Sequence, residues 1–265
     1  MSRPELTAPP EIFYNDEEAK KYTFNSRIMA IQEQMCERAL ELLSLPEDQT
    51  CLLLDVGCGS GLSGMVLEEH EHHWIGVDIS SSMLKIATER VTGDLLLSDM
   101  GQGVPFKAGT FDGAVSISAL QWICNIDKSS HSLNKRLNAF FTSLFACLAR
   151  GARAVFQFYP QSEQQISIIT AAATRCGFMG GVVVDYPNSK KAKKFFLVLM
   201  TSGMVKLPKA LGDGDAHRHK NKKEDKLRKC SKTWIFKKKE RRLMKGLEVK
   251  RDSKYTGRKR SNRKF

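Results

Sequence analysis

A cluster of glycines follows an acid and an apolar run in the stretch LLLDVGCGSGLSG, residues 52–64. Glycines tolerate positive φ and let the backbone approach a ligand closely, which suits Gly57, Gly59 and Gly61 to a binding turn. Asp55, two residues before the first of them, would repel a pyrophosphate but favours a ligand with an amino group. S-adenosyl-L-methionine carries an ammonium and a sulfonium, so these four residues are candidates for binding it as the cofactor.

Two further acids stand where later strands are expected to end. Asp78 closes the apolar stretch 72–80, and an acid at this place accepts hydrogen bonds from ribose hydroxyls. Asp99 would accept from an adenine amino group, with Ile79 and Met100 as apolar walls on the two faces of the ring. The pattern favours an adenosine that lies across three consecutive strand ends. The alternative is a glycine turn that only packs, with the acids acting as helix caps.

The glycine turn and the acids resemble those of S-adenosylmethionine-dependent methyltransferases, in which the segment after the fourth strand faces the methyl donor. That segment here is SISALQWICN, residues 116–125, so the resemblance implies that it carries the candidate residues for the methyl acceptor. It has no Pro-Cys nucleophile, no Asn-Pro-Pro-Tyr element, and no Lys or His to act as a general base. The acceptor should therefore be an atom that already has a lone pair, such as guanine N7, and positioning would supply most of the catalysis. Trp122 would stack on a flipped-out base unless it is a core aromatic. Three polar side chains would hydrogen-bond the edge of that base: Ser118, Gln121 and Asn125.

The elements that position these residues alternate along the chain. Short apolar runs predict strands at 52–56, 72–80, 94–100, 110–118, 152–160, 180–187 and 192–200. Helical spacing of apolar residues predicts helices at 25–45, 62–70, 81–91, 134–151 and 163–178, the fourth of them closed by Gly151. Alternation implies a parallel sheet, and the close final pair implies a terminal antiparallel hairpin. The sequence thus predicts an α/β fold with a seven-stranded, mostly parallel sheet.

Charge is divided unevenly along the 265 residues, which carry a formal net charge of +13. Residues 206–265 hold 24 Lys or Arg against 7 Asp or Glu, which leaves 18 against 22 for residues 1–205. Basic blocks in this tail are interleaved with four aromatics, Trp234, Phe236, Tyr255 and Phe265. That composition favours binding to a polyanion, here RNA, over a tail that is only solvated or serves as a nuclear import signal.

The domain organisation follows from these patterns. We expect an N-terminal segment and helix covering the active site at 1–48, a methyltransferase domain at 49–205, and a basic RNA-binding tail at 206–265. No apolar run approaches the roughly 18 residues of a membrane span, and the N-terminus has no apolar signal region, so neither membrane insertion nor secretion is expected. Seven cysteines without a C-x-x-C pair suit a reducing compartment.

The histidines of EEHEHHW, residues 68–74, stand beside acids but precede the second strand and have no second ligand cluster, so no metal site is expected.

Asp55-Val56-Gly57-Cys58-Gly59-Ser60-Gly61 matches D/E-x-G-x-G-x-G, and the chain resembles the Rossmann-like class I S-adenosylmethionine-dependent methyltransferases. Five longer stretches narrow the match: PPEIFYNDEEAKKYTFNSR, LLDVGCGSGLSG, GDLLLSDMGQGVPFKAGTFDGAVSISALQW, VVVDYPNSKKAKKFFLVL and YTGRKR. Together they resemble the eukaryotic 18S ribosomal RNA (guanine-N7) methyltransferase family.

This resemblance implies methylation of N7 of one guanosine in 18S ribosomal RNA and a role in small-subunit maturation on pre-40S particles. It also implies residence in the nucleus (nucleoplasm and nucleolus) and the cytoplasm. The implied partner is a small zinc-binding methyltransferase activator subunit that forms a heterodimer with the chain.

The third strand gives a physical reason for such a partner. In this sheet order it is expected at an edge, where Leu95, Leu96 and Leu97 would be an aggregation hazard unless a partner strand covered them. The alternative is that helices bury these leucines on both faces.

Two other functions stay open from the sequence. Gly59, Gly61 and Gly64 also fit the dinucleotide fingerprint of a nicotinamide oxidoreductase, although that match alone is weak. The chain could also act as a ribosome-assembly factor whose binding matters more than its catalysis.

Overall fold

The computed structural model describes residues 3–46, 49–126, 131–189, 191–203 and 207–212, together with 235, 236, 239, 242, 249–253 and 256. The chain divides into two compact units, Met1–Ala210 and Leu211–Phe265. Of the predicted tail aromatics, Phe236 is described, whereas Trp234, Tyr255 and Phe265 lie outside the described residues.

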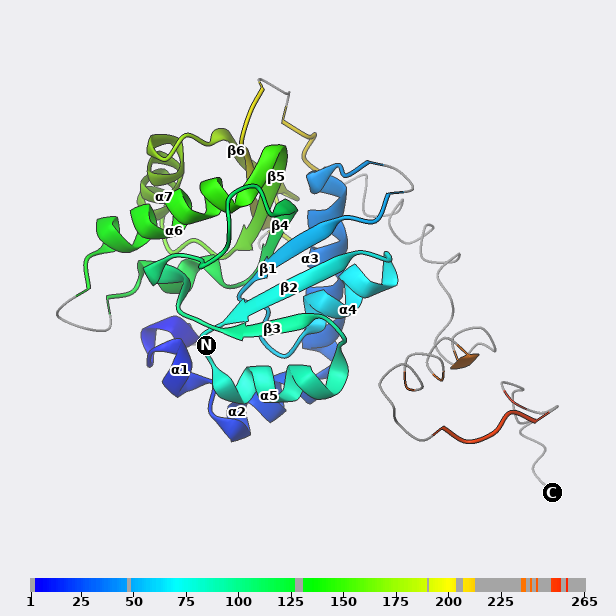
Figure 1. The fold of residues 1–265 in the computed structure, drawn as a ribbon. Helices are drawn as coiled ribbons and strands as arrows, with labels where there is room; N and C mark the ends of the chain where they lie inside the picture. The colour runs from blue at the N-terminus through cyan, green and yellow to red at the C-terminus, as the bar shows by residue number, and fades with distance from the viewer. Residues whose placement is uncertain are drawn as a thin grey trace. The chain divides into compact units, whose positions relative to one another are not determined.

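Within the described residues of the first unit, seven strands form one sheet in the order β3-β2-β1-β4-β5-β7-β6 (Figure 1). The strands are β1 (Leu52–Val56), β2 (His73–Asp78), β3 (Asp94–Leu97), β4 (Phe111–Ile117), β5 (Leu148–Phe158), β6 (Met179–Asp185) and β7 (Lys194–Met200). Strands β1 to β5 run parallel to one another, and β7 is antiparallel to both β5 and β6. The predicted mostly parallel sheet with a terminal antiparallel hairpin is confirmed.

Helices cover both faces of the sheet because each carries one apolar stripe. One face is packed by α3 (Ser26–Leu43), α4 (Leu62–Glu69) and α5 (Ser81–Arg90), and the other by α6 (Leu133–Cys147) and α7 (Glu163–Arg175), as Figure 1 shows. The predicted start of α3 is stabilised by an N-cap side chain. Asn25 Oδ1 accepts from the N–H groups of Arg27 and Ile28 at the start of α3.

The prediction of a helix over 134–151 is wrong at its end. Helix α6 stops at Cys147, and β5 begins at the next residue, Leu148, which pairs with Phe111 of β4. Gly151 lies inside the strand at φ 87°, so it does not close the helix. Leu148 is buried in the strand, and strand pairing here prevails over the helical pattern of the preceding residues.

Strand β3 lies at an edge of the sheet and pairs with β2 along its length. Leu97 is 58 % exposed, and Leu95 and Leu96 are half-buried. The predicted exposed edge is therefore confirmed, and the alternative of leucines buried on both faces is not. No helix in the described part of the chain is long and apolar enough to span a membrane.

Three short helices precede α3: η1 (Pro4–Leu6), α1 (Pro10–Phe13) and α2 (Asp16–Phe24). They are tied to the carboxyl ends of the strands by several hydrogen bonds. Arg3 donates to the carbonyls of Tyr159 and Pro160 beyond β5, at 3.0 and 2.9 Å, and Ser80 Oγ donates to the carbonyl of Tyr14 at 2.9 Å. The N-terminal segment is thereby held over the edge where parallel strands end.

Candidate active site

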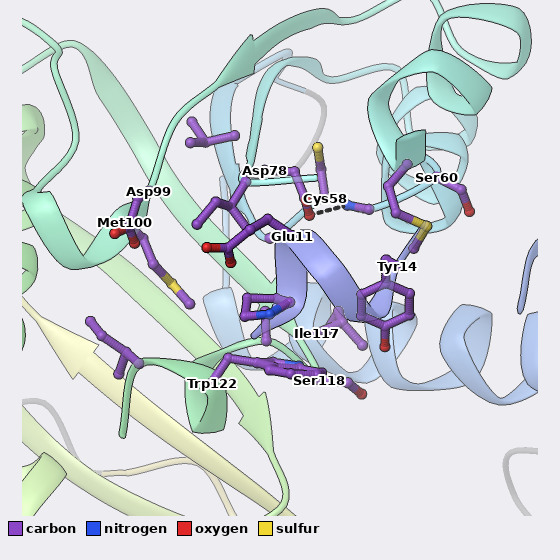
Figure 2. A pocket seen from close by; sticks show the side chains of 18 of the residues that line it. Glu11, Tyr14, Cys58, Ser60, Asp78, Asp99, Met100, Ile117, Ser118 and Trp122 are labelled. Atoms are coloured by element: carbon purple, nitrogen blue, oxygen red, sulfur yellow. Dashed lines mark hydrogen bonds between the residues drawn. The ribbon is translucent and has the colours of Figure 1, made fainter. Parts of the chain in front are cut away.

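A cavity opens where the strand ends meet the N-terminal helices (Figure 2). Its lining combines the turns after β1, β2, β3 and β4 with residues of α1, α2, α3 and α6. The residues that line it are Pro10, Glu11, Tyr14, Tyr22, Gln32, Gly57, Cys58, Gly59, Ser60, Leu62, Ser63, Val77, Asp78, Ile79, Met83, Ser98, Asp99, Met100, Ile117, Ser118, Ala119, Trp122, Ile123, His131 and Arg136.

The glycine turn forms one wall. Gly57 and Gly59 have φ of 74° and 53°, in the left-handed region that side chains disfavour. A Cβ added to Gly57 would lie 2.2 Å from the Cβ of Ala119, so the turn also fits closely against the segment after β4. Gly61, the third predicted glycine, does not line the cavity; it precedes α4 and faces Val91.

Asp55 lies under this turn and is completely buried. Ser63 Oγ donates to its Oδ2 at 2.5 Å, and Oδ1 has no partner within the described residues. Burial raises the pKa of Asp55 to about 7 against the opposing effect of the Ser63 hydrogen bond. An unpartnered buried carboxylate oxygen is costly, and a cationic group at the turn would stabilise the charged form.

Asp78 faces the cavity from the end of β2 (Figure 2). Its Oδ2 accepts from Gly59 N–H and its Oδ1 from Ser80 N–H, both at 2.8 Å. Burial raises the pKa of Asp78, although these backbone donors act in the opposite direction. Each carboxylate oxygen can accept a second hydrogen bond, so the side chain is fixed in place and can still accept from ribose hydroxyls.

Asp99 is held by Arg136 of α6, a residue that the sequence reasoning missed. Arg136 Nη1 and Nη2 donate to its two carboxylate oxygens at 2.8 and 3.0 Å, and Gly101 N–H donates at 2.8 Å. Burial of Asp99 acts to raise its pKa, but these hydrogen bonds outweigh burial and the pKa is lowered. A Cβ on Gly101 would lie 2.2 Å from Arg136 Cζ, which explains the glycine there. Nothing local in the sequence links Asp99 to Arg136, 37 residues later.

The predicted apolar walls also line the cavity. Ile79 and Met100 follow Asp78 and Asp99 directly, so each stands beside an acid at a strand end. Met100 points into the cavity in Figure 2. The structure therefore brings six predicted cofactor residues together on the lining: Gly57, Gly59, Asp78, Ile79, Asp99 and Met100.

The predicted acceptor residues separate into two pairs. Ser118 and Trp122 line the cavity, whereas Gln121 and Asn125 do not. Gln121 Nε2 donates to the carbonyl of Ser118 at 2.8 Å, and Asn125 Nδ2 donates to the carbonyl of Glu5. These two amides hold the backbone of the segment, and their contact with a base stays a prediction.

Trp122 is 7 % exposed and is packed beneath the N-terminal segment. Its ring centroid lies 6.0 Å from that of Phe13 and 5.7 Å from that of Tyr14. It is thus both a packed aromatic and part of the lining, and stacking on a base stays a prediction.

Ser118 belongs to a line of hydrogen bonds that we call the Ser118 chain: Tyr22, Gln32, Ser118 and Gln157. Gln32 Nε2 donates to Ser118 Oγ at 3.3 Å, and Ser118 Oγ donates to Gln157 Oε1 at 2.8 Å. Tyr22 is hydrogen-bonded to Gln32, and burial raises the pKa of Tyr22. Ser118 has φ of 61°, and backbone strain of this kind is retained where surrounding contacts fix a functional site.

Sequence reasoning also missed the lining residues of the N-terminal segment: Pro10, Glu11, Tyr14, Tyr22 and Gln32. The signal available was the density of aromatics in PPEIFYNDEEAKKYTF, which is high for an exposed segment. His131, at the start of α6, was missed because the acceptor segment was taken to end at residue 125. Its Nδ1 is buried and has no partner among the described residues.

Residues 53–149 match a family model described as a methyltransferase domain, and residues 200–262 match one described as a methyltransferase involved in Williams-Beuren syndrome. The 18S rRNA (guanine-N(7))-methyltransferase of Mus musculus is 54 % identical over 98 % of this chain and 98 % of its own length. This chain belongs to the 18S rRNA (guanine-N7) methyltransferase family. A member from Saccharomyces cerevisiae, 18S rRNA (guanine(1575)-N(7))-methyltransferase, is 48 % identical over 99 % of this chain and 100 % of its own.

Solved methyltransferase structures confirm the Rossmann-like class I fold. The fold of this chain is similar to that of Haemonchus contortus phosphoethanolamine N-methyltransferase 2 with bound S-adenosylhomocysteine, with a TM-score of 0.55. The match has 17 % sequence identity and covers 71 % of this chain and 57 % of that chain. The fold is also similar to that of magnesium protoporphyrin IX methyltransferase from Synechocystis with bound S-adenosylmethionine, at a TM-score of 0.53 and 14 % identity over 76 % and 99 % of the two chains.

Proposed function

We propose that this protein transfers the methyl group of S-adenosylmethionine to N7 of a guanine in 18S ribosomal RNA, and so takes part in small-subunit maturation. The observation that carries the proposal is the match, end to end, to curated 18S rRNA (guanine-N7) methyltransferases such as the mouse relative at 54 % identity. An oxidoreductase is excluded by that membership. The acids at three neighbouring strand ends and the glycine turn supply the physical basis.

The residues of the cavity fit the cofactor. Asp78 would accept hydrogen bonds from the ribose hydroxyls, and Ile79 and Met100 would contact the faces of the adenine ring. Asp99 would accept from the adenine amino group, which a carboxylate can do while it remains paired with Arg136. Asp55 and the glycine turn favour the methionine ammonium, because the unpartnered Oδ1 lies buried below the turn.

Methylation of guanine N7 requires no proton to be removed from the acceptor atom. When bound, the cofactor would supply an electrophilic methyl group to the N7 lone pair, and the electron pair of the broken S–C bond would remain on sulfur. Since N7 bears no hydrogen, no general base is needed, and the chain contributes position and electrostatics. Ser118 and Trp122 lie on the lining next to the glycine turn, where they would orient the acceptor base.

A direct test is methyl transfer by the purified protein to 18S ribosomal RNA, followed by cleavage at N7-methylguanosine to find the site. A single modified guanosine that disappears with Asp78→Ala supports the proposal. Methyl transfer to a base atom other than guanine N7 would overturn it.

The basic tail is proposed to bind RNA phosphates. Residues 206–265 hold 24 Lys or Arg against 7 Asp or Glu, whereas residues 1–205 hold 18 against 22. Removal of the tail should weaken RNA binding and flatten its dependence on salt, with the affinity for S-adenosylmethionine nearly unchanged. An unchanged salt slope would instead indicate an import signal or a solvated appendage.

We further propose that a small zinc-binding activator subunit covers the β3 edge. Leu97 of β3 is exposed, and the outer side of β3 pairs with no other strand among the described residues. Both features suit the addition of a strand from a partner. The chain expressed alone should be poorly soluble or weakly active and should improve on co-expression with the activator. A stable, fully active monomer would contradict this.

Residence in the nucleus (nucleoplasm and nucleolus) and the cytoplasm, and association with pre-40S particles, complete the proposal. Imaging of the tagged chain and its co-sedimentation with 40S precursors test both. A ribosome-assembly role that outweighs catalysis is tested separately. Cells with the inactive but folded Asp78→Ala variant would then assemble small subunits normally, whereas cells without the protein would not.

A further inference from the structure

The loop between β6 and β7 lies on the same edge of the sheet as the cavity. Strand β6 runs antiparallel to β7, which is antiparallel to β5, so β6 ends on the edge where β4 and β5 end. The loop comprises residues 186–193, and with Lys194 at the start of β7 we call it the lysine loop. None of the residues that line the cavity belongs to the lysine loop.

The backbone of the lysine loop is folded into two hydrogen-bonded turns. Ser189 N–H donates to the carbonyl of Tyr186, and Lys193 N–H donates to the carbonyl of Ser189, both at 3.0 Å. Ser189 Oγ accepts from Ala192 N–H at 3.1 Å. The described residues of the loop, 186–189 and 191–193, therefore have a backbone held by hydrogen bonds.

Its charge is positive and is not neutralised by nearby acids. The sequence has lysines at 190, 191, 193 and 194 and no acid from 186 to 203. Within the described residues, Lys191, Lys193 and Lys194 form no ion pair. The preceding acid, Asp185, is 1 % exposed and is bound by Arg38 Nε at 2.9 Å.

Two of the lysines are positioned by aromatic rings. Lys194 Nζ lies 4.9 Å from the Tyr159 ring centroid and donates to Tyr159 Oη at 3.1 Å. Lys193 Nζ lies 5.4 Å from the Phe195 ring centroid. Rings attract ammonium groups without cancelling their charge, so both amines remain able to bind an anion.

The lysine loop is close to the acceptor side of the cavity. Ser118 N–H donates to the Gln157 carbonyl at 2.9 Å, and Gln157 of β5 is in register with Phe196 of β7. Strand β5 lies between β4 and β7, so Lys194, where the loop joins β7, is about two strand spacings, or about 10 Å, from the end of β4. A nucleic acid strand with one base at Ser118 would carry its adjacent phosphates past this loop.

We propose that the lysine loop binds the phosphates of the RNA strand next to the target guanosine. The proposal rests on the proposed function for the identity of the substrate. RNA fits better than an acidic protein because the ligand must share this edge with a base in the cavity. The loop would set the path of the strand, and the cavity would select the base.

The test replaces the two exposed lysines, as Lys191→Ala with Lys193→Ala, in the full-length protein. A charge-retaining variant has arginine at both positions. A matched control, Lys107→Ala with Arg150→Ala, removes two exposed positive charges near the starts of β4 and β5, at the opposite edge of the sheet. The substrate is an 18S ribosomal RNA fragment that contains the methylated guanosine, assayed over a range of salt concentrations.

The alanine pair should raise KM for RNA about tenfold at physiological salt and reduce the slope of log affinity against log salt by about 1.4, or about 0.7 for each phosphate contact. The turnover number at saturating RNA and the affinity for S-adenosylmethionine should stay as in the wild type. The arginine pair should restore KM, and the control should leave it unchanged. All variants carry the same tail, so its contribution cancels.

An alanine pair with wild-type KM and salt slope would overturn the proposal, and so would a control with an equal effect, because only net charge would then matter. A wild-type protein that does not methylate the fragment would contradict the proposed function instead. The salt dependence of RNA binding, measured without turnover, would still decide the role of the loop in that case.

Discussion

The strand-end turns and the Ser118 chain line the same cavity but are built in different ways. The turns join strand ends that follow one another along the chain: Gly59 N–H binds Asp78, 19 residues later, and Ser80 N–H binds the same carboxylate. The Ser118 chain joins α2, α3, the turn after β4 and strand β5, with 86 residues between Gln32 and Ser118. Motifs at the strand ends therefore mark most of the cofactor side, to which packing adds Arg136, whereas packing alone assembles the Ser118 chain.

Substitutions in the turns should have the largest effect on cofactor binding. Gly57→Arg places a side chain where φ is 74° and Ala119 lies 2.2 Å from the new Cβ, so binding of S-adenosylmethionine should be lost. Asp78→Ala should weaken it about a hundredfold by removing a charged acceptor. Isothermal titration measures both, with thermal melting as the control for folding. Wild-type affinity in both variants would disprove the assignment of the cofactor side.

Arg136→Gln should make cofactor binding more sensitive to pH. Burial alone would raise the pKa of Asp99, and the Arg136 guanidinium is the main group that holds it low. In the wild type the carboxylate stays charged as the pH falls; in the variant it takes up a proton at higher pH. Affinity of the variant should fall more steeply than that of the wild type between pH 7.5 and pH 5, because Asp55 and Asp78 titrate in both proteins and only Asp99 differs. Parallel curves would contradict this role.

Gln32→Ala should affect the acceptor side alone. It removes the bond to Ser118 Oγ and the bond to Tyr22, so the turnover number should fall about fivefold to tenfold while the affinity for S-adenosylmethionine stays within about twofold. Gln34→Ala, at an exposed position of the same helix, is the matched control. A loss of cofactor affinity equal to the loss of turnover would show that the two sides are one unit.

Asp55→Asn should have the smallest effect of these substitutions. It should change how the free energy of unfolding depends on pH. Burial raises the pKa of Asp55 to about 7 in the folded chain, so the folded state binds the proton more tightly than the unfolded state. Its contribution to the free energy of unfolding should then fall as pH rises from about 4 to about 7. Chemical denaturation of the wild type and of Asp55→Asn measures this. Identical pH profiles for the two proteins would contradict the raised pKa.

The comparison also explains what the sequence could predict. The mostly parallel sheet with its terminal hairpin and the acids at 78 and 99 follow from local patterns, because strand ends and glycine turns have short-range signatures, and the β3 edge follows from the expected fold. Arg136, Tyr22 and Gln32 are brought to the cavity by packing, and no local spacing marks them. The end of α6 was misplaced for the same reason, since pairing of Leu148 with a distant strand decided it.

The central claim is that the chain positions a guanine whose N7 lone pair attacks the methyl group without help from a base. The most direct test uses an 18S ribosomal RNA fragment in which the methylated guanosine is replaced by 7-deazaguanosine, which keeps the Watson–Crick edge but has carbon in place of N7. We predict that this fragment binds as tightly as the natural one and receives no methyl group in a single-turnover assay. Methyl transfer to the 7-deazaguanosine fragment at the rate of the natural one would contradict the account.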